Sequence, residues 1–202
     1  MSNGQVRNEE QFALQTLRGL FPSSFSKSLM NFDSPDLQDS HNGIGIEIAR
    51  CMLPTQGQIN GFLKQYNRKS RDAIPPEKID KLIALGHKPC WINDELRGVF
   101  SPGYPPIPYM LLPTVQQKID KLQKPSFTKF PSNRLFLFVW QQIGIYQHWQ
   151  MHEFIENVNS LQCHKTHKFD VIYVFDTHHN GYDLWVCYLN TNYVRKIRRE
   201  FS

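Results

Sequence analysis

The sequence predicts an α/β protein in which helices pack against a β-sheet. Apolar residues recur at helical spacing from Asn8 to Leu20. Apolar residues alternate with small or polar ones over IGIEIA at 44–49, which is the pattern of a strand. The nearly continuous apolar run RLFLFVWQQIGI at 134–145 is typical of a strand in the interior of a sheet.

A hairpin is expected after the first helix. The segment 25–32 is a strand candidate, and DSPDLQ at 33–38 leads into DSHNG, where Asn42-Gly43 favours a tight turn. In the strand beyond that turn, Glu47 shares its face with Gly45 and Ala49. These small neighbours would let a metal ion, water or another backbone approach Glu47 closely.

Residues 54–112 are expected to form an insertion with its own helices, because an uninterrupted loop of that length is rare. An apolar stripe at 59–66 indicates one helix, and PPEKIDKLIALG at 75–86, with Pro at its start and Gly at its end, indicates a second. The Pro- and Gly-rich segment 87–110 is expected to be irregular. We therefore expect a single domain over 1–202 that contains this insertion.

The remaining elements continue the alternation of helices and strands. They are a helix at 113–124, the strand within 134–145, a helix at 148–161, and two strands at 169–176 and 183–189 joined by an Asn-Gly turn. The predicted order is helix, hairpin, insertion, helix, strand, helix, strand, strand.

Two acidic residues stand out in the predicted hairpin. Asp36 begins one arm, directly after Pro35, and Glu47 lies inside the other. A carboxylate inside a strand is unfavourable unless it is solvated, paired or bound to a metal. Two converging carboxylates and a backbone carbonyl would suit Mg²⁺ or Mn²⁺, although a turn-capping Asp36 and an exposed or ion-paired Glu47 are the simpler interpretations.

The motif SPD at 34–36, followed by GIEIA at 45–49, resembles the PD-(D/E)XK nuclease superfamily. The resemblance covers about 8–48 and 113–137. It implies a restriction-endonuclease-like α-β-β-β-α-β core, a mixed sheet flanked by helices with the insertion after the third strand. It also implies Mg²⁺ or Mn²⁺ held by Asp36, Glu47 and the Ile48 carbonyl, with Glu10, or else Glu9, as an auxiliary acid.

The motif departs from the family at one position. The family's lysine would fall at 49, where this chain has Ala49. Either a lysine of the following helix replaces it, Lys121 in the first place and Lys118 in the second, or the site has lost catalysis. Arg50 is a poor substitute because it should point to the face opposite Glu47.

The resemblance implies a metal-dependent nuclease-like protein that hydrolyses phosphodiester bonds, with DNA favoured over RNA. The alternative is an inactive nuclease-fold module that binds nucleic acid or a protein partner. Four basic residues are candidates for phosphate contacts, although such residues are most often solvated: Arg50, Lys64, Arg68 and Lys69. The formal charge of +5 supports a polyanionic partner only weakly, and the oligomeric state, a homodimer included, is left open.

A zinc site is the second metal hypothesis. His148 and His152 have helical i, i+4 spacing, and Cys163, His164 and His167 follow, but HWQMH lacks the glutamate of HExxH. A helix with surface histidines is the simpler interpretation. The aromatic residues Trp140, Trp149, Tyr173 and Trp185 are expected in the core.

The cysteine usage and the N-terminus bear on location. The four cysteines are far apart and show no CxxC pair, which predicts a reducing cytoplasmic environment. The polar start MSNGQVRNEEQ has no signal-peptide core, and no apolar run is long enough to cross a bilayer. No membrane partner is expected.

Overall fold

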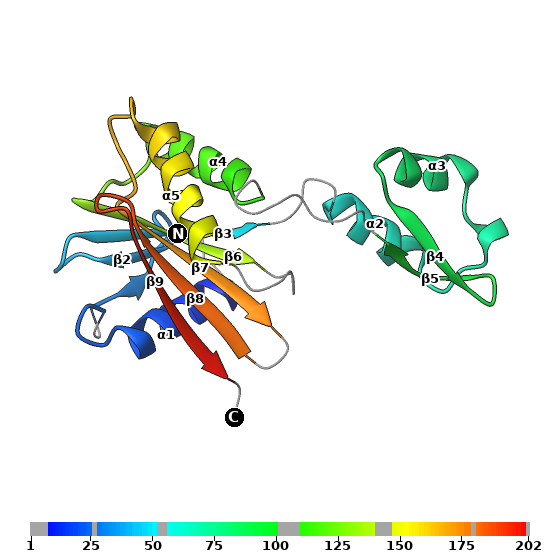
Figure 1. The fold of residues 1–202 in the computed structure, drawn as a ribbon, viewed down its shortest axis with the longest axis horizontal. Helices are drawn as coiled ribbons and strands as arrows, with labels where there is room; N and C mark the ends of the chain where they lie inside the picture. The colour runs from blue at the N-terminus through cyan, green and yellow to red at the C-terminus, as the bar shows by residue number, and fades with distance from the viewer. Residues whose placement is uncertain are drawn as a thin grey trace. The chain divides into compact units, whose positions relative to one another are not determined.

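The computed structural model describes residues 8–25, 28–51, 56–100, 110–139, 147–178 and 181–200. The chain forms two compact units, shown in Figure 1. The first, which we call the sheet unit, consists of Met1–Cys51 and Ile107–Ser202. The second, the inserted unit, consists of Met52–Pro106.

The sheet unit is built on a seven-stranded mixed sheet with the order β1-β2-β3-β6-β7-β8-β9. β3, β6 and β7 are parallel, and antiparallel strands flank them on both sides. The strands are β1 (Met30–Asn31), β2 (Leu37–Asp39), β3 (Ile44–Cys51), β6 (Ser132–Val139), β7 (Val171–His178), β8 (Gly181–Tyr188) and β9 (Tyr193–Glu200). The prediction of a mixed α/β protein is confirmed.

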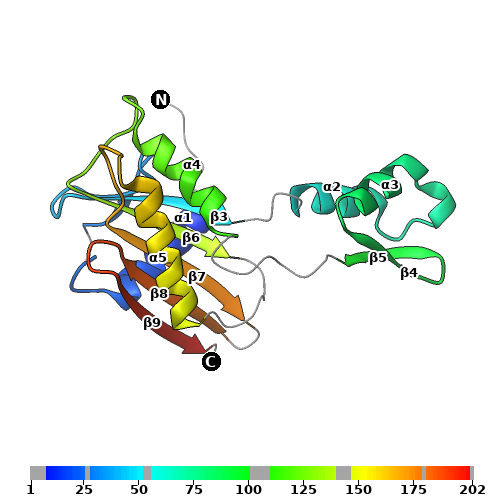
Figure 2. The ribbon, with the colours of Figure 1, turned by 45° about the horizontal axis from the view of Figure 1, so that its top comes forward.

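Helices cover both faces of this sheet (Figures 1 and 2). α1 (Asn8–Leu20) lies on one face, and α4 (Leu112–Leu122) and α5 (His148–Gln162) lie on the other. The helix predicted at Asn8–Leu20 is confirmed over the described residues, and it ends at Leu20 as expected. The helices predicted from 113 and 148 are confirmed as well.

Strand alternation divides the core between these two faces. On the α1 side, Ala13 and Leu17 join Ile46, Phe136 and Tyr173 in one apolar cluster. On the other side, α5 buries an apolar stripe against the sheet: Met151, Phe154, Ile155 and Val158. Glu47 of β3 belongs to this second face, beneath α4.

The inserted unit has its own small core. The helices α2 (Gln56–Tyr66) and α3 (Pro76–Ala84), both predicted, pack with a hairpin of β4 (Lys88–Ile92) and β5 (Glu95–Phe100). The expectation of irregular structure was wrong at 88–100, and 101–109 lie outside the described residues. The reason is the turn at Asn93-Asp94, where both residues adopt positive φ, 51° and 61°, and so close a two-residue hairpin.

One strand was not anticipated, and one further expectation was wrong. The basic C-terminal segment forms strand β9. Trp149 is 64% exposed on α5 rather than buried, whereas Tyr173 and Trp185 are core residues as expected. Trp140 lies outside the described residues.

No helix in the described part of the chain combines the length and the apolarity needed to cross a membrane.

Candidate functional site

Glu47 is a buried carboxylate bound by two lysines. Its side chain is 2% exposed, and Oε2 accepts hydrogen bonds from Lys118 Nζ at 2.7 Å and Lys121 Nζ at 2.8 Å. The other oxygen, Oε1, is buried without a hydrogen-bond partner among the described residues. Both lysines nominated from the sequence therefore meet Glu47.

Helix α4 places these two ammonium groups because of its amphipathic pattern. Val115, Ile119 and Leu122 are buried against the sheet, and the lysines, three residues apart, flank that stripe. Lys118 is 17% exposed and Lys121 is 39% exposed. Lys121 also lies over the ring of Phe127, with Nζ 5.1 Å from its centroid.

Asp36 lies beside Glu47 at the start of β2. The ladder pairs Leu37 with Ile46, so one further step of the same register brings Asp36 opposite Glu47. Asp36 Oδ2 accepts a hydrogen bond from the Ile48 amide at 2.7 Å. Burial raises the pKa of Asp36 and the charge of Glu47 raises it further, against the opposing effects of the Ile48 amide and the lysines.

A cavity of about 160 Å³ opens next to Asp36. Its lining includes Asp36, Ile48 and Ala49 from the hairpin and Glu10 from α1. Ala49 stands where the motif's lysine would be, and its small side chain borders this space. Glu10, the expected auxiliary acid, therefore shares a cavity with Asp36.

Arg50 lines the same cavity but belongs to the other face of β3 from Glu47. It forms an ion pair with Glu9 of α1. The prediction that Arg50 points away from Glu47 is confirmed. Arg50 is therefore paired with α1, and the charge of Glu47 is balanced by the lysines of α4 instead.

Gly45, the other small neighbour of Glu47, contacts side chains. A Cβ at this position would lie 2.5 Å from Phe130 Cδ2 and 2.7 Å from Pro35 Cγ. The space beside Gly45 is therefore filled by the proline that precedes Asp36 and by Phe130. The small residue fixes the approach of the Asp36 turn to β3.

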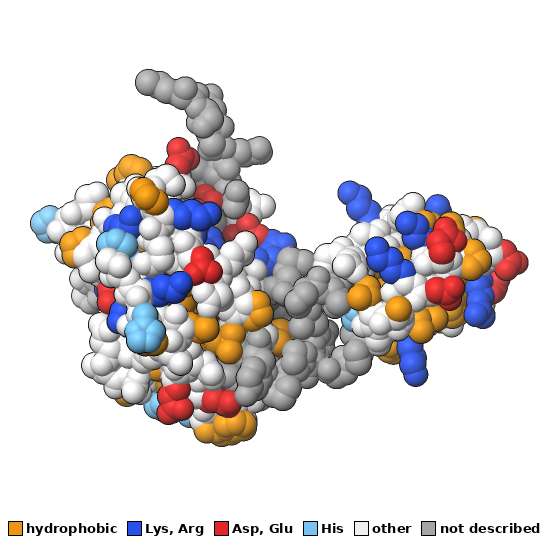
Figure 3. Space-filling model, turned by 90° about the horizontal axis from the view of Figure 1, so that it is seen from above, with side chains coloured by type: hydrophobic (Ala, Val, Ile, Leu, Met, Phe, Trp, Pro, Cys, Tyr) orange, Lys and Arg blue, Asp and Glu red, His pale blue; other side chains and the backbone are white. Residues whose placement is uncertain are grey.

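The other phosphate-binding candidates lie in the inserted unit. Lys64, Arg68 and Lys69 are exposed there, and Lys69 Nζ lies 5.4 Å from the centroid of the Tyr66 ring. Figure 3 shows Lys and Arg side chains scattered among acidic and apolar ones on the visible surface of each unit. These three residues belong to a different compact unit from Asp36 and Glu47.

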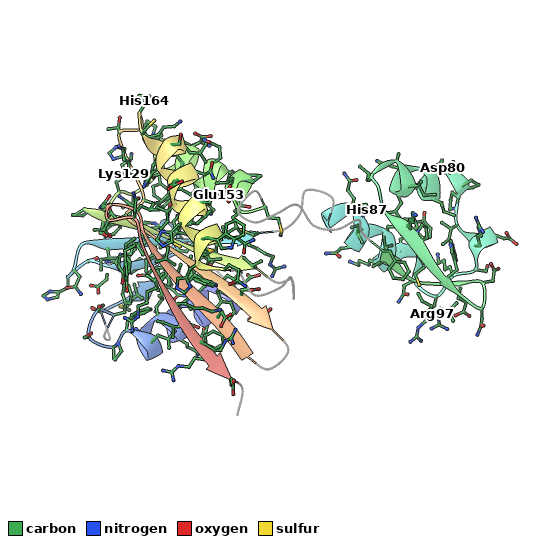
Figure 4. All side chains as sticks on the ribbon, viewed as in Figure 1. Asp80, His87, Arg97, Lys129, Glu153 and His164 are labelled. Carbon is green, nitrogen blue, oxygen red and sulfur yellow. The ribbon has the colours of Figure 1, made fainter. Side chains whose placement is uncertain are left out.

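The described histidines are not part of a group that could hold a metal ion. Over the described ranges, no group of three or more His, Cys, Asp or Glu side chains is placed to hold a metal ion. His148 at the start of α5 makes an edge contact with the ring of Trp185, with centroids 5.0 Å apart. His164 lies beyond the opposite end of α5 (Figure 4).

A second pair of buried acids escaped the sequence interpretation. Asp176 of β7 and Asp183 of β8 are cross-strand partners, 3% and 1% exposed. Burial opposes the charge of Asp183, but hydrogen bonds from Arg198 and Lys196 outweigh it and lower its pKa. Burial and the charge of Asp183 raise the pKa of Asp176 to about 8. One sequence signal could have found this pair. An Asp lies in each of the two predicted strands that the Asn-Gly turn joins, so the two can face each other across the hairpin.

Fold and site together define a mixed α/β protein with a buried carboxylate and lysine cluster on its central sheet. Comparison with known protein families, with curated proteins and with solved structures finds no match to this chain. The function of this chain is therefore inferred from the geometry of the cluster.

Proposed function

We propose that this chain is a metal-dependent, nuclease-like protein that hydrolyses phosphodiester bonds of nucleic acid, with DNA favoured. The observation that carries the proposal is the contact of Glu47 with Lys118 and Lys121, beside a second carboxylate, Asp36. These are the residue types of the PD-(D/E)XK motif, with its lysine supplied by α4. A helix, an antiparallel three-stranded meander, a helix and a strand parallel to the third support the same class.

The residue types of this site would suit a hard divalent cation. Glu47 Oε1 is a buried oxygen without a partner among the described residues, and Asp36 borders a cavity together with Ile48. Asp36, Glu47 and the Ile48 carbonyl would hold the metal, with Glu10 as the auxiliary acid. Bound Mg²⁺ or Mn²⁺ would supply an activated water and neutralise charge on the phosphodiester.

The two lysines divide the remaining work. Lys118 is the less exposed and has the larger effect of the two on Asp36, so it balances the charge of both carboxylates. Lys121 is the more exposed and is held by Phe127, which leaves its ammonium near solvent to orient water or contact the phosphate.

A second candidate function is a nuclease-fold module without chemistry that binds nucleic acid or a protein partner. Ala49 favours it, and so does the fact that both ammonium groups bind the same oxygen of Glu47. An arrangement of this kind can serve as a structural ion cluster, in which Glu47 anchors α4 to the sheet.

The experiment incubates purified protein with single- and double-stranded DNA and RNA, in Mg²⁺, in Mn²⁺ and in chelator. Asp36→Ala and Glu47→Ala are the test variants, and Lys168→Ala is a surface control. Metal-dependent cleavage that both test variants lose supports the nuclease. Binding without cleavage supports the inactive module, and cleavage that persists in both variants indicates a contaminant.

A further inference from the structure

Strand β9 carries four basic residues, two on each of its faces. Lys196 and Arg198 point to the α5 side, where both bind the buried carboxylate of Asp183. Arg195 and Arg199 point to the other side, opposite Val186 and Tyr182 of β8. Lys196 and Arg198 therefore have a structural role, whereas Arg195 and Arg199 are placed to contact a ligand.

Arg195 and Arg199 have no acidic partner among the described residues, and both are exposed. They lie four positions apart on one strand, about 13 Å at the usual rise. Ile197 between them packs into the core cluster of the sheet and fixes this spacing. Two guanidinium groups held on a rigid strand are suited to different phosphates of one chain.

Aromatic residues continue this face beyond Arg195. Tyr193 is 56% exposed, and its ring lies against Tyr188 with centroids 5.8 Å apart and an interplanar angle of 32°. The two tyrosines are cross-strand partners at the β8–β9 turn. An exposed ring held by a neighbouring ring offers a flat surface on which an unpaired base can stack.

We propose that the face of β8–β9 formed by Tyr188, Tyr193, Arg195 and Arg199 binds single-stranded nucleic acid. The arginines contact phosphates, and Tyr193 stacks on a base. Paired bases do not expose their faces, so the aromatic end selects a single strand. The inference deepens the proposed function, on which it rests for the class of partner, because it specifies a single-stranded segment.

The charge of the face favours a polyanion over an apolar partner. β9 is also the last strand of the sheet order, and an edge strand can pair with an added peptide strand. An acidic peptide is therefore the competing occupant. The exposed tyrosine next to two arginines without an acidic partner in the described part of the chain favours nucleic acid.

The experiment measures binding of labelled single-stranded DNA and RNA oligonucleotides by fluorescence anisotropy over a range of salt, in chelator. Chelator separates binding from cleavage. If the wild type binds in chelator but does not cleave when Mg²⁺ or Mn²⁺ is restored, that result counts against the proposed function alone. Arg195→Ala/Arg199→Ala should weaken binding and lower the slope of log affinity against log salt by about 1.4. Tyr193→Ala should weaken it about 5-fold or more, and Tyr193→Phe should restore it.

The matched control is Lys124→Ala/Lys168→Ala, which removes two positive charges from exposed lysines of other segments. It should change the affinity less than 2-fold. An equal loss in the two double variants would mean general charge attraction and would overturn the proposal. So would equal affinity for single and double strands, or retention of polyglutamate but not of oligonucleotides. If the alanine double variant fails to fold, Arg195→Gln/Arg199→Gln replaces it.

Discussion

Glu47 is buried, and its negative charge is balanced by the two lysine ammonium groups of α4. Removing such a carboxylate lets the partly exposed lysines turn into solvent. Removing the lysines instead leaves a charge in the interior without compensation. The two deletions should therefore differ in cost.

Lys118→Met/Lys121→Met should lower the free energy of unfolding by about 3–5 kcal/mol at pH 7, because it isolates the Glu47 charge. Glu47→Gln should cost clearly less. Urea denaturation of both variants at pH 7 measures the difference. An equal or smaller loss in the lysine double variant would contradict this account of the cluster.

In the absence of metal, burial and the charge of Glu47 disfavour the negative charge of Asp36. Its pKa is raised in the folded state, so its contribution to stability is complete below the unfolded pKa and is lost as the pH rises through the folded pKa. At pH 7, which lies above the unfolded pKa, the raised pKa of Asp36 is a net cost to stability. Asp36→Asn should therefore raise the free energy of unfolding by about 0.5–2 kcal/mol in chelator. A loss of stability in a thermal melt would show that the Ile48 hydrogen bond dominates.

The sequence identified the principal side chains of the cluster through two periodicities. Strand alternation separated Glu47 from Arg50, and helical spacing put Lys118 and Lys121 on one side of α4. The exposure of each lysine was not predictable, because it depends on the rotation of α4 against the sheet. Asp176 and Asp183 were missed because each looked like the end of a strand.

At the scale of elements, β3 and the turn before β2 fit together through Gly45. Gly45→Ala should lower the free energy of unfolding by about 1–3 kcal/mol, because the added Cβ meets Phe130 and Pro35 below contact distance. Gly19→Ala on α1, where nothing lies within 4 Å, is the matched control and should stabilise by about 0.5–1 kcal/mol. Denaturant titration compares them, and equal effects would refute the packing argument.

Strands β7 and β8 carry a pH dependence of their own. The pKa of Asp176 is raised to about 8, so its contribution to stability is complete at acid pH and is lost as the pH rises toward 8. The free energy of unfolding of Asp176→Asn, relative to that of the wild type, should rise by at least about 1 kcal/mol between pH 5 and pH 8. Urea titrations at several pH values test this, and a constant difference would show that Asp176 is ionised throughout.

Two elements were hidden from the sequence for physical reasons. The β4–β5 hairpin closes through Asn93 and Asp94 in positive φ, which the Pro- and Gly-rich surroundings disguised. β9 has cations on both faces, and the buried Asp183 that neutralises one pair lies on another strand. Helices with a clear apolar stripe were predictable because their signal is local.

At the scale of the molecule, the inserted unit has a core separate from that of the sheet unit. Replacing Met52–Pro106 by a flexible Gly-Ser linker should leave the sheet unit folded, since its seven strands and three helices lie outside that segment. Circular dichroism and a cooperative thermal transition measure this outcome. Loss of cooperative unfolding would show that the sheet unit depends on the insertion.

The order of helices and strands was predictable apart from the β4–β5 hairpin and β9, but the pairing of β3 with β6 was not predicted. Those strands are parallel neighbours although the inserted unit and α4 separate them in the chain. Such a pairing depends on buried contacts between distant segments, which no local pattern reports.

The most direct test of the central claim is the single-turnover rate of DNA cleavage by the wild type and by Asp36→Asn, in Mg²⁺ and in chelator. The wild type should cleave only with metal, and the variant should lose about 100-fold or more of that rate while it gains stability. An unchanged rate in Asp36→Asn, or no metal-dependent cleavage by the wild type, would contradict the assignment of Asp36 and Glu47 as a hydrolytic metal site.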